Sequence, residues 1–235
     1  GYSIHKEQKP APRAHNRCGN EGTMNPKQAH YQTLAKTVLK NLEKRNITGC
    51  YCATSEDARK EVASFLSIDT SVSFGGSMTL EESGVLDLLR QDDSIHLIDR
   101  AKAKTPEETA QMYHAALSCD LYLMSTNAIA ADGTLVNIDG TGNRVAALIY
   151  GPSKVLILAG MNKVVPSAEE ALSRVHHTAT PMNCKRLDKK TPCAVTGVCA
   201  DCLSPDCICN QVVFTRRSAI PGRIHVILIG EELGY

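Results

Sequence analysis

The chain has 235 residues, of which 43% are hydrophobic and 22% are charged, and its formal net charge is +1. This length fits one globular domain with a sizeable core. The near-neutral charge gives no electrostatic reason to expect nucleic acid or a membrane surface as partner. No apolar run approaches the roughly 20 residues that a membrane span requires, so we expect a cytoplasmic protein with a small-molecule partner.

The N-terminal stretch differs from the rest of the chain. Residues 1–23 are polar, are interrupted by proline and glycine, and contain no apolar region that follows a basic start. We predict that residues 1–23 are a leader or a disordered arm, and that residues 24–235 form the α/β domain.

The first predicted elements alternate between helix and strand. Asn25 followed by Pro26 is typical of a helix start, and the next apolar residues recur at helical spacing. A short β-branched and aromatic run then predicts a strand, and Thr54 with Glu56 predicts the cap of a second helix. The predicted helices cover about 26–45, 54–66, 79–90, 106–117, 144–149 and 167–177, and the strands between them cover 47–53, 71–74, 95–98, 121–124 and 155–159.

This alternation predicts a mainly parallel sheet with helices on both faces. An Asp132-Gly133 turn between apolar flanks predicts a β-hairpin inserted within 127–139. Two further strands, 212–215 and 224–229, should finish the edge of the sheet. His176 and His177 should end a helix as caps rather than bind metal.

Two loops between a strand and a helix are candidates for anion binding. Such loops present backbone N–H groups and the positive end of a helix dipole. The first supplies Gly75, Gly76, Ser77 and Thr79, and it could equally be an ordinary capped turn. The second runs from Asp139 through Gly140, Gly142 and Asn143 to Arg144, whose guanidinium could hold a carboxylate or phosphate bidentately.

A third loop, 160–163, ends in Lys163, which could meet the same ligand or be a solvated surface lysine. All three loops should lie at the carboxyl ends of parallel strands, where ligands bind in sheets of this kind. Asp132 or Asp139 could act as a base there, but both are also ordinary turn residues.

A cluster of cysteines near the C-terminus predicts a metal or iron–sulfur site. Cys193, Cys199, Cys202 and Cys209 lie within one Gly- and Pro-containing segment, with Cys207 beside them. Buried apolar packing does not explain thiols among Thr, Gly, Asp, Ser and Pro, and four thiolates suit zinc or an iron–sulfur cluster. Cys184 could replace Cys207 or Cys209, and spacing alone does not separate the two kinds of metal.

Five blocks in order resemble the lactate utilisation (LUD) domain family, in particular its short, stand-alone, cysteine-bearing members. They are SFGGSMTLEESG, NAIAADGTLVNIDGTGNR, ILAGMNKVV, PMNCKRLDKKTPCAVTGVCADC and RIHVILIGEELGY, and the likeness runs from about Met24 to Tyr235. The resemblance implies a fold similar to the ribose-phosphate isomerase, glucosamine-phosphate deaminase and CoA-transferase superfamily.

The resemblance also implies a pocket and a ligand set. The implied pocket consists of Gly75, Gly76, Ser77, Asn127, Asp132, Gly140, Asn143, Arg144 and Lys163. Cys193, Cys199, Cys202 and Cys209 are implied as the cysteines shared by the stand-alone members, within a cluster-binding loop at 183–210. Larger relatives carry a ferredoxin-like module and oxidise lactate with partner proteins, whereas this chain has cysteines for one cluster only.

These observations leave three kinds of function open. The first is an iron–sulfur protein of organic-acid metabolism, with a small carboxylate or phosphate beside a 4Fe–4S cluster and an electron-transfer protein as a further partner. The second is a redox-neutral isomerase or acyl transferase with structural zinc. The third is a non-catalytic metabolite or redox sensor, and a homo-oligomer is compatible with all three.

Overall fold

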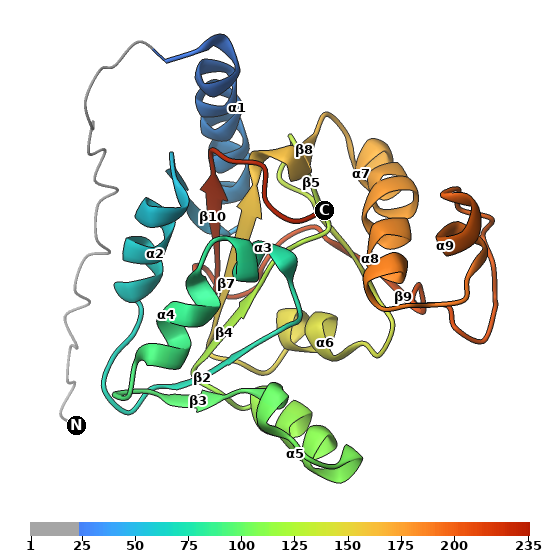
Figure 1. The fold of residues 1–235 in the computed structure, drawn as a ribbon. Coiled ribbons are helices and arrows are strands. Elements are labelled where there is room, and N and C mark those ends of the chain that lie inside the picture. The colour runs from blue at the N-terminus through green and yellow to red at the C-terminus, as the bar shows by residue number, and fades with distance from the viewer. Residues whose placement is uncertain (1–23) are drawn as a thin grey trace, which may run out of the picture.

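The computed structural model describes residues 24–235, so the prediction for residues 1–23 lies outside the described residues. Its largest element is a sheet of six parallel strands in the order β1-β10-β7-β4-β2-β3 (Figure 1). The strands are β1 (Thr48–Cys52), β2 (Ser71–Phe74), β3 (His96–Ile98), β4 (Leu121–Met124), β7 (Lys154–Gly160) and β10 (Ile224–Ile229). The predicted parallel α/β sheet is confirmed.

Helices cover both faces of this sheet. On one face α1 (Pro26–Glu43), α5 (Pro106–Ala116) and α6 (Asn143–Ile149) bury apolar side chains against the strands. On the other face α2 (Ser55–Ala63), α3 (Met78–Glu82) and α4 (Val85–Gln91) do the same. The central strand β7 is buried along almost its whole length because both faces are covered.

Local capping explains where several helices begin. The side chain of Asn25 accepts a hydrogen bond from the Gln28 amide at 2.9 Å, and Pro26 is the first helical residue. Thr54 caps α2 in the same way, through the Asp57 amide at 3.2 Å. These caps satisfy amide groups that lack an acceptor within the helix, so the sequence determines these helix starts locally.

A second, smaller sheet has the order β8-β5-β6-β9. It contains the predicted hairpin, since β5 (Ala128–Ala130) and β6 (Leu135–Asp139) pair antiparallel, and it also contains β8 (Val164–Val165) and β9 (Gln211–Thr215). Its inner face packs against α7 (Ala168–Arg174). The hairpin therefore belongs to a separate layer that lies beside the main sheet.

The prediction for the two C-terminal strands was wrong in placement. β9 pairs with β6 in the small sheet, whereas β10 lies inside the main sheet between β1 and β7. All six β10 residues except His225 are buried, as a strand with neighbours on both sides requires.

The predicted helix end at His177 was also wrong. α7 continues through a π-helical turn at Val175–Ala179 into α8 (Thr180–Arg186), so His176 and His177 lie within a continuous helical segment. A short helix, α9 (Pro192–Thr196), and the cysteine-rich segment follow. Figure 1 shows α9 on the side of the molecule away from α2 and α4.

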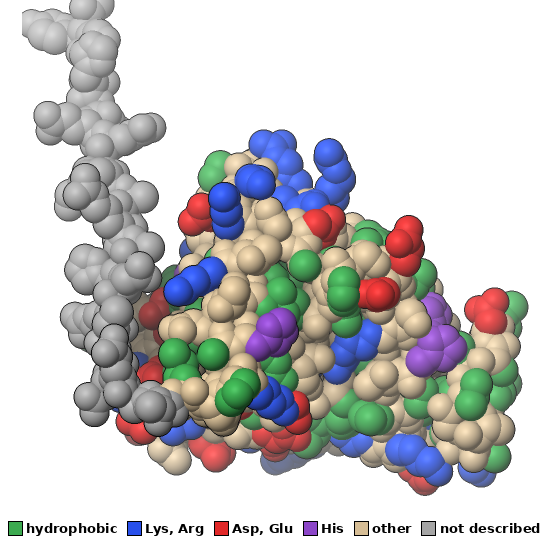
Figure 2. Space-filling model, turned by 90° about the horizontal axis from the view of Figure 1, so that it is seen from above, with side chains coloured by type: hydrophobic (Ala, Val, Ile, Leu, Met, Phe, Trp, Pro, Cys, Tyr) green, Lys and Arg blue, Asp and Glu red, His purple; other side chains and the backbone are tan. Residues whose placement is uncertain are grey.

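The surface carries mixed charge. On the face seen in Figure 2, acidic and basic side chains are interspersed, in keeping with the net charge of +1. Within residues 24–235, no helix is long and apolar enough to cross a membrane.

Candidate functional site

A cleft of about 480 Å³ lies where several strands of the main sheet end. The loops after β2, β4 and β7 meet there, which is the edge of a parallel sheet where ligands bind. Its lining includes the predicted residues Gly76, Ser77, Asn127, Asp139, Gly140, Asn143, Arg144 and Lys163. The structure therefore brings most of the predicted pocket residues together.

Basic side chains predominate in this cleft. The ionisable lining residues are Arg100, Arg144, Lys163, Arg186 and Lys189, against the single acidic residue Asp139 and the thiol of Cys207 and phenols of Tyr113 and Tyr235. Positive charge concentrated in a concave site raises the local concentration of anions. The lining is thus suited to an anionic ligand.

Lys163 is the most perturbed charged group of the cleft. Its side chain is 4% exposed, and its Nζ donates one hydrogen bond, to Ser125 Oγ at 3.0 Å. Burial, with the charges of Arg174 and Arg144, lowers the pKa of Lys163 to about 7. An ammonium group has three donors, so Lys163 keeps hydrogen-bonding capacity for a ligand.

Arg144 is held inside the protein rather than free for a ligand. Its Nε donates to Asp139 Oδ1 at 3.0 Å, and its Nη1 and Nη2 donate to four further oxygens at 2.7 to 3.0 Å. Those oxygens belong to Ser125, Asn127, Asn137 and Ile138. Because all five donors of the guanidinium are used, the predicted bidentate hold on a ligand does not fit this geometry.

Asp139 is held in place by the same network. Its Oδ1 accepts from Arg144, and its Oδ2 accepts from the backbone amide of Val145 in the first turn of α6, at 2.8 Å. Both carboxylate oxygens therefore accept hydrogen bonds from within the protein. This arrangement organises the loop before α6 and occupies the atoms that a general base would use to accept a proton.

Asp132 does not lie in the cleft. It sits in the β5–β6 turn, where its carboxylate accepts from the Thr134 amide at 2.8 Å and pairs with Arg45 at 2.8 Å. Partial burial acts to raise its pKa, but the contacts with Thr134 and Arg45 outweigh burial, so that the pKa is lowered. Asp132 therefore lies apart from the predicted pocket residues that line the cleft, and its position fits the alternative interpretation as a turn residue.

Three other predicted residues do not line the cleft but support the residues that do. A Cβ on Gly75 would come within 3.1 Å of the Arg144 side chain, so glycine allows the close approach of this loop. Thr79 is buried, and its Oγ1 lies 3.4 Å from Ser125 Oγ, next to the Lys163 contact. Gly142 begins α6 with φ of 85°, a conformation that favours glycine.

The cysteine-rich segment borders the cleft through Cys207. Cys193 and Cys184 are both buried, with their sulfur atoms 3.8 Å apart. Cys207 Sγ accepts from the Cys209 amide at 3.3 Å. Burial, augmented by the neighbouring Cys207 and Cys184, raises the pKa of Cys209 to about 12.

The other two predicted ligands lie beside different partners. Cys199 Sγ is 3.7 Å from His176 Nδ1, and Cys202 Sγ is 3.4 Å from Ser204 Oγ. The hydrogen bond with Ser204 lowers the pKa of Cys202. The structure thus places Cys184 beside Cys193 and Cys207 beside Cys209.

The spacing of these thiols tests their fit to a metal. A tetrahedral zinc site with Zn–S bonds of about 2.3 Å places its sulfur atoms about 3.8 Å apart. Between residues 24 and 235, no three sulfur atoms of this segment lie within 4.8 Å of one another. A four-iron cluster bonds each thiolate at a separate iron corner, and an all-sulfur donor set suits either zinc or such a cluster.

A profile of the LUD domain matches residues 35–229 of the chain. The chain belongs to the LUD domain family. The family resemblance indicated by the five sequence blocks is therefore confirmed, and the protein is of the lactate-utilisation type.

Solved structures support the fold of this LUD domain. A DUF162 family protein from Deinococcus radiodurans is similar over 85% of this chain and 98% of its own, with 11% identity and a TM-score of 0.50. The delta subunit of eIF2B from Chaetomium thermophilum covers 60% of this chain and 54% of its own, with 17% identity and a TM-score of 0.31. The first similarity shows a shared fold, and the second carries no argument. The comparison with curated proteins gives no match.

Some cleft residues of the LUD domain were missed by sequence reasoning. Ser125 follows β4 directly, so its position at a strand end was an available signal. Tyr235 is the last residue, and its buried hydroxyl has no hydrogen-bond partner. Asn183, Arg186 and Lys189 reach the cleft from α8 and the chain after it, and no local motif marks them.

Proposed function

We propose that this LUD-domain protein binds a small organic-acid anion in the cleft, with the Lys163 ammonium as its principal anchor. The observation that carries the proposal is a buried lysine with a single hydrogen-bond partner, Ser125, at the end of a parallel sheet. An anion would supply the missing acceptors and offset the burial of positive charge.

Other cleft groups support a carboxylate ligand. Burial raises the pKa of Tyr235, so its unpartnered hydroxyl keeps its proton at neutral pH and can donate a hydrogen bond. Ser77 and Asn143 add polar groups from the loops before α3 and α6. A short hydroxy acid such as lactate presents a carboxylate and a hydroxyl to such a site, and a phosphate ester would use the same cationic groups.

We further propose that the neighbouring cysteines hold a 4Fe–4S cluster. The candidate ligands are Cys193, Cys199, Cys202 and Cys209, with Cys184 and Cys207 close enough to replace two of them. When bound, the cluster would supply one-electron transfer. Cys207 connects the segment to the cleft, so a bound anion would lie beside the cysteines.

A second candidate function is redox-neutral chemistry, and the perturbed lysine favours it. With a pKa of about 7, a fraction of Lys163 is unprotonated at neutral pH and can accept a proton from a substrate. Lys163 would then take the role that the sequence predicted for Asp132 or Asp139. Turnover that persists after the iron is removed would support this candidate.

Calorimetric titration with lactate and with inorganic phosphate tests the anion site. Lys163→Met should weaken binding by about 10- to 100-fold, since a hydrogen bond to a charged group contributes about 1.5–3 kcal/mol. Lys154→Met is the matched control, because Lys154 is also partly buried but does not line the cleft. Equal affinity in the wild type and Lys163→Met would contradict the proposal, and the preferred anion identifies the ligand class.

A further inference from the structure

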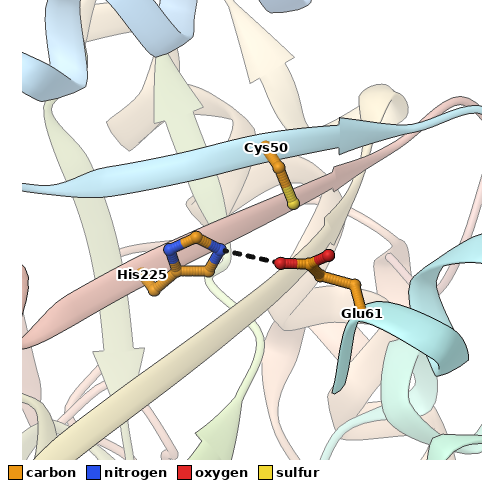
Figure 3. A group of neighbouring side chains, drawn as sticks. All are labelled: Cys50, Glu61 and His225. Carbon is orange, nitrogen blue, oxygen red and sulfur yellow. Dashed lines mark ion pairs between the residues drawn. The ribbon is translucent and has the colours of Figure 1, made fainter. Parts of the chain in front are cut away.

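A second group of metal-ligating side chains lies outside the cleft. The ligand atoms of Cys50, Glu61 and His225 all lie within 4.8 Å of one another, and no other such group of three occurs in residues 24–235. Figure 3 shows the three side chains converging from β1, α2 and β10. The group is far from α9 and the cysteine-rich segment, since α2 lies on the opposite side of the molecule (Figure 1).

The backbone places these residues on one interface. His225 pairs with Thr48 and Cys50 pairs with Ile227 in the parallel β1–β10 ladder, so Cys50 and His225 are diagonal neighbours. Ile227, two residues after His225, packs in the core that α2 covers. On α2, Glu61 lies between Ala58 and Val62 in helical position, and both of those residues are buried in the same core.

The hydrogen bonds around His225 bear on which of its two ring nitrogens carries the proton. Its Nδ1 is 2.8 Å from Thr48 Oγ1, whose hydroxyl donates to the Ile224 carbonyl at 3.4 Å. When the Thr48 hydroxyl donates to Ile224, it accepts from an Nδ1–H group, and in this tautomer the lone pair of the ring is on Nε2. This Nε2 is buried, has no hydrogen-bond partner and lies 3.8 Å from Glu61 Oε1.

In the part of the chain that the structure describes, no positively charged side chain lies between the ligand atoms of Cys50, Glu61 and His225. The Nε2 lone pair of His225 faces the Glu61 carboxylate at 3.8 Å, and the Cys50 thiol is the one group that can donate a hydrogen bond into the space between the three ligand atoms. Lys154 does not fill the gap, because its Nζ donates to the Gly222 carbonyl at 2.6 Å and lies over the Phe65 ring.

We propose that Cys50, Glu61 and His225 form a binding site for one Zn²⁺ ion. Thiolate, carboxylate and imidazole are the three donors that zinc binds in proteins, and three protein ligands leave a fourth position for water. The Thr48 hydrogen bond to the opposite ring nitrogen orients His225 as the outer partner of a metal-bound histidine does. Binding releases the Cys50 thiol proton to solvent, with no change of oxidation state. This site is independent of the proposed function of the cleft.

Zinc content at equal free Zn²⁺ tests the site in the full-length chain. Glu61→Gln and Cys50→Ala should each bind one equivalent less than the wild type. Cys119→Ala should match the wild type, because Cys119 is a buried thiol outside this group of ligands. The zinc content of each variant is compared with that of the wild type because segment 183–210 can also bind zinc and would contribute equally to both. Glu61 is 36% exposed and glutamine has the same shape, so this variant should keep the fold, as checked by circular dichroism.

A spectroscopic measurement makes the same test at His225. Adding Zn²⁺ should shift the Nε2 resonance of His225 in the wild type and in Cys119→Ala, and leave it unchanged in Cys50→Ala. Equal zinc stoichiometry in the wild type and Glu61→Gln, or an unshifted His225 resonance at saturating Zn²⁺, would overturn the proposal.

Discussion

Two basic residues of the cleft, Arg144 and Lys163, differ in how many of their hydrogen-bond donors have partners within the protein. Arg144 has every donor satisfied within the protein, whereas Lys163 has one partner and a lowered pKa. The sequence placed both residues at strand ends, and the structure confirms that both line the cleft. The sequence could not distinguish their roles, because the oxygens around Arg144 come from the loop after β4 and from β6.

Replacing Arg144 should destabilise the fold. In Arg144→Met the buried Asp139 carboxylate loses its partner, and breaking a buried ion pair costs about 3–5 kcal/mol. Asp132→Asn is the matched control, because Asp132 is 54% exposed and a surface pair is worth about 0–1 kcal/mol. Urea unfolding measures both free energies, and a similar small loss in both variants would contradict the structural role of Arg144.

The pKa of Lys163 predicts two pH dependences of opposite sign. Anion affinity should fall as the pH rises through about 7, because the ammonium loses its proton. The stability of the ligand-free protein should rise between about pH 7 and pH 10, because there the unfolded chain binds more protons than the folded one. Titration calorimetry and urea unfolding over this range measure the two trends. In Lys163→Met the pH dependence of anion affinity should vanish, and the rise in stability should be smaller than in the wild type.

At the scale of elements, the sequence predicted the types of most helices and strands but not the strand order. Alternating patterns and caps such as Asn25 are local, so they were readable. The insertion of β10 between β1 and β7 joins residues more than 60 positions apart in the chain, and no local pattern records it. The uninterrupted burial of 226–229 was consistent with a central strand.

The position of β10 predicts its hydrogen exchange. The amides of Val226, Ile227 and Leu228 should be among the slowest to exchange, because exposing them requires opening of the sheet core. Those of the edge strand β3 should exchange faster, since it has one neighbour. Native-state hydrogen exchange measured by NMR makes the comparison, and faster exchange in β10 than in β3 would contradict this topology.

The cysteine-rich segment shows a similar limit of sequence reasoning. Its spacing indicated that the thiols act together, yet it did not show that Cys184 lies 3.8 Å from Cys193. Packing of α8 against α9 brings these two cysteines together, and they lie nine residues apart on two different helices.

Iron content should follow the cysteines of this segment. Cys193→Ala and Cys209→Ala should each reduce the iron and sulfide bound after anaerobic reconstitution, because both cysteines belong to the proposed set of four ligands. Cys119→Ala should bind as the wild type does, since Cys119 lies in the main core. Iron binding that is the same in all four proteins would place any cluster elsewhere.

In the molecule as a whole, the two proposed sites lie apart and have different kinds of side chains. The cleft, at the carboxyl ends of β2, β4 and β7, joins the cysteine-rich segment through Cys207. The Cys50, Glu61 and His225 group lies on the interface of α2 with β1 and β10. The family and the fold place the cleft within a shared scaffold, whereas its ligand follows from its own charges and unpartnered groups.

An anaerobic crystal structure of the protein with lactate would show the anion site and the cysteine-rich segment together. We expect a carboxylate oxygen about 3 Å from Lys163 Nζ, with anomalous scattering from iron at the cysteine-rich segment. An empty cleft at saturating lactate and phosphate, or an anion bound away from Lys163 with no iron at the cysteines, would contradict this expectation.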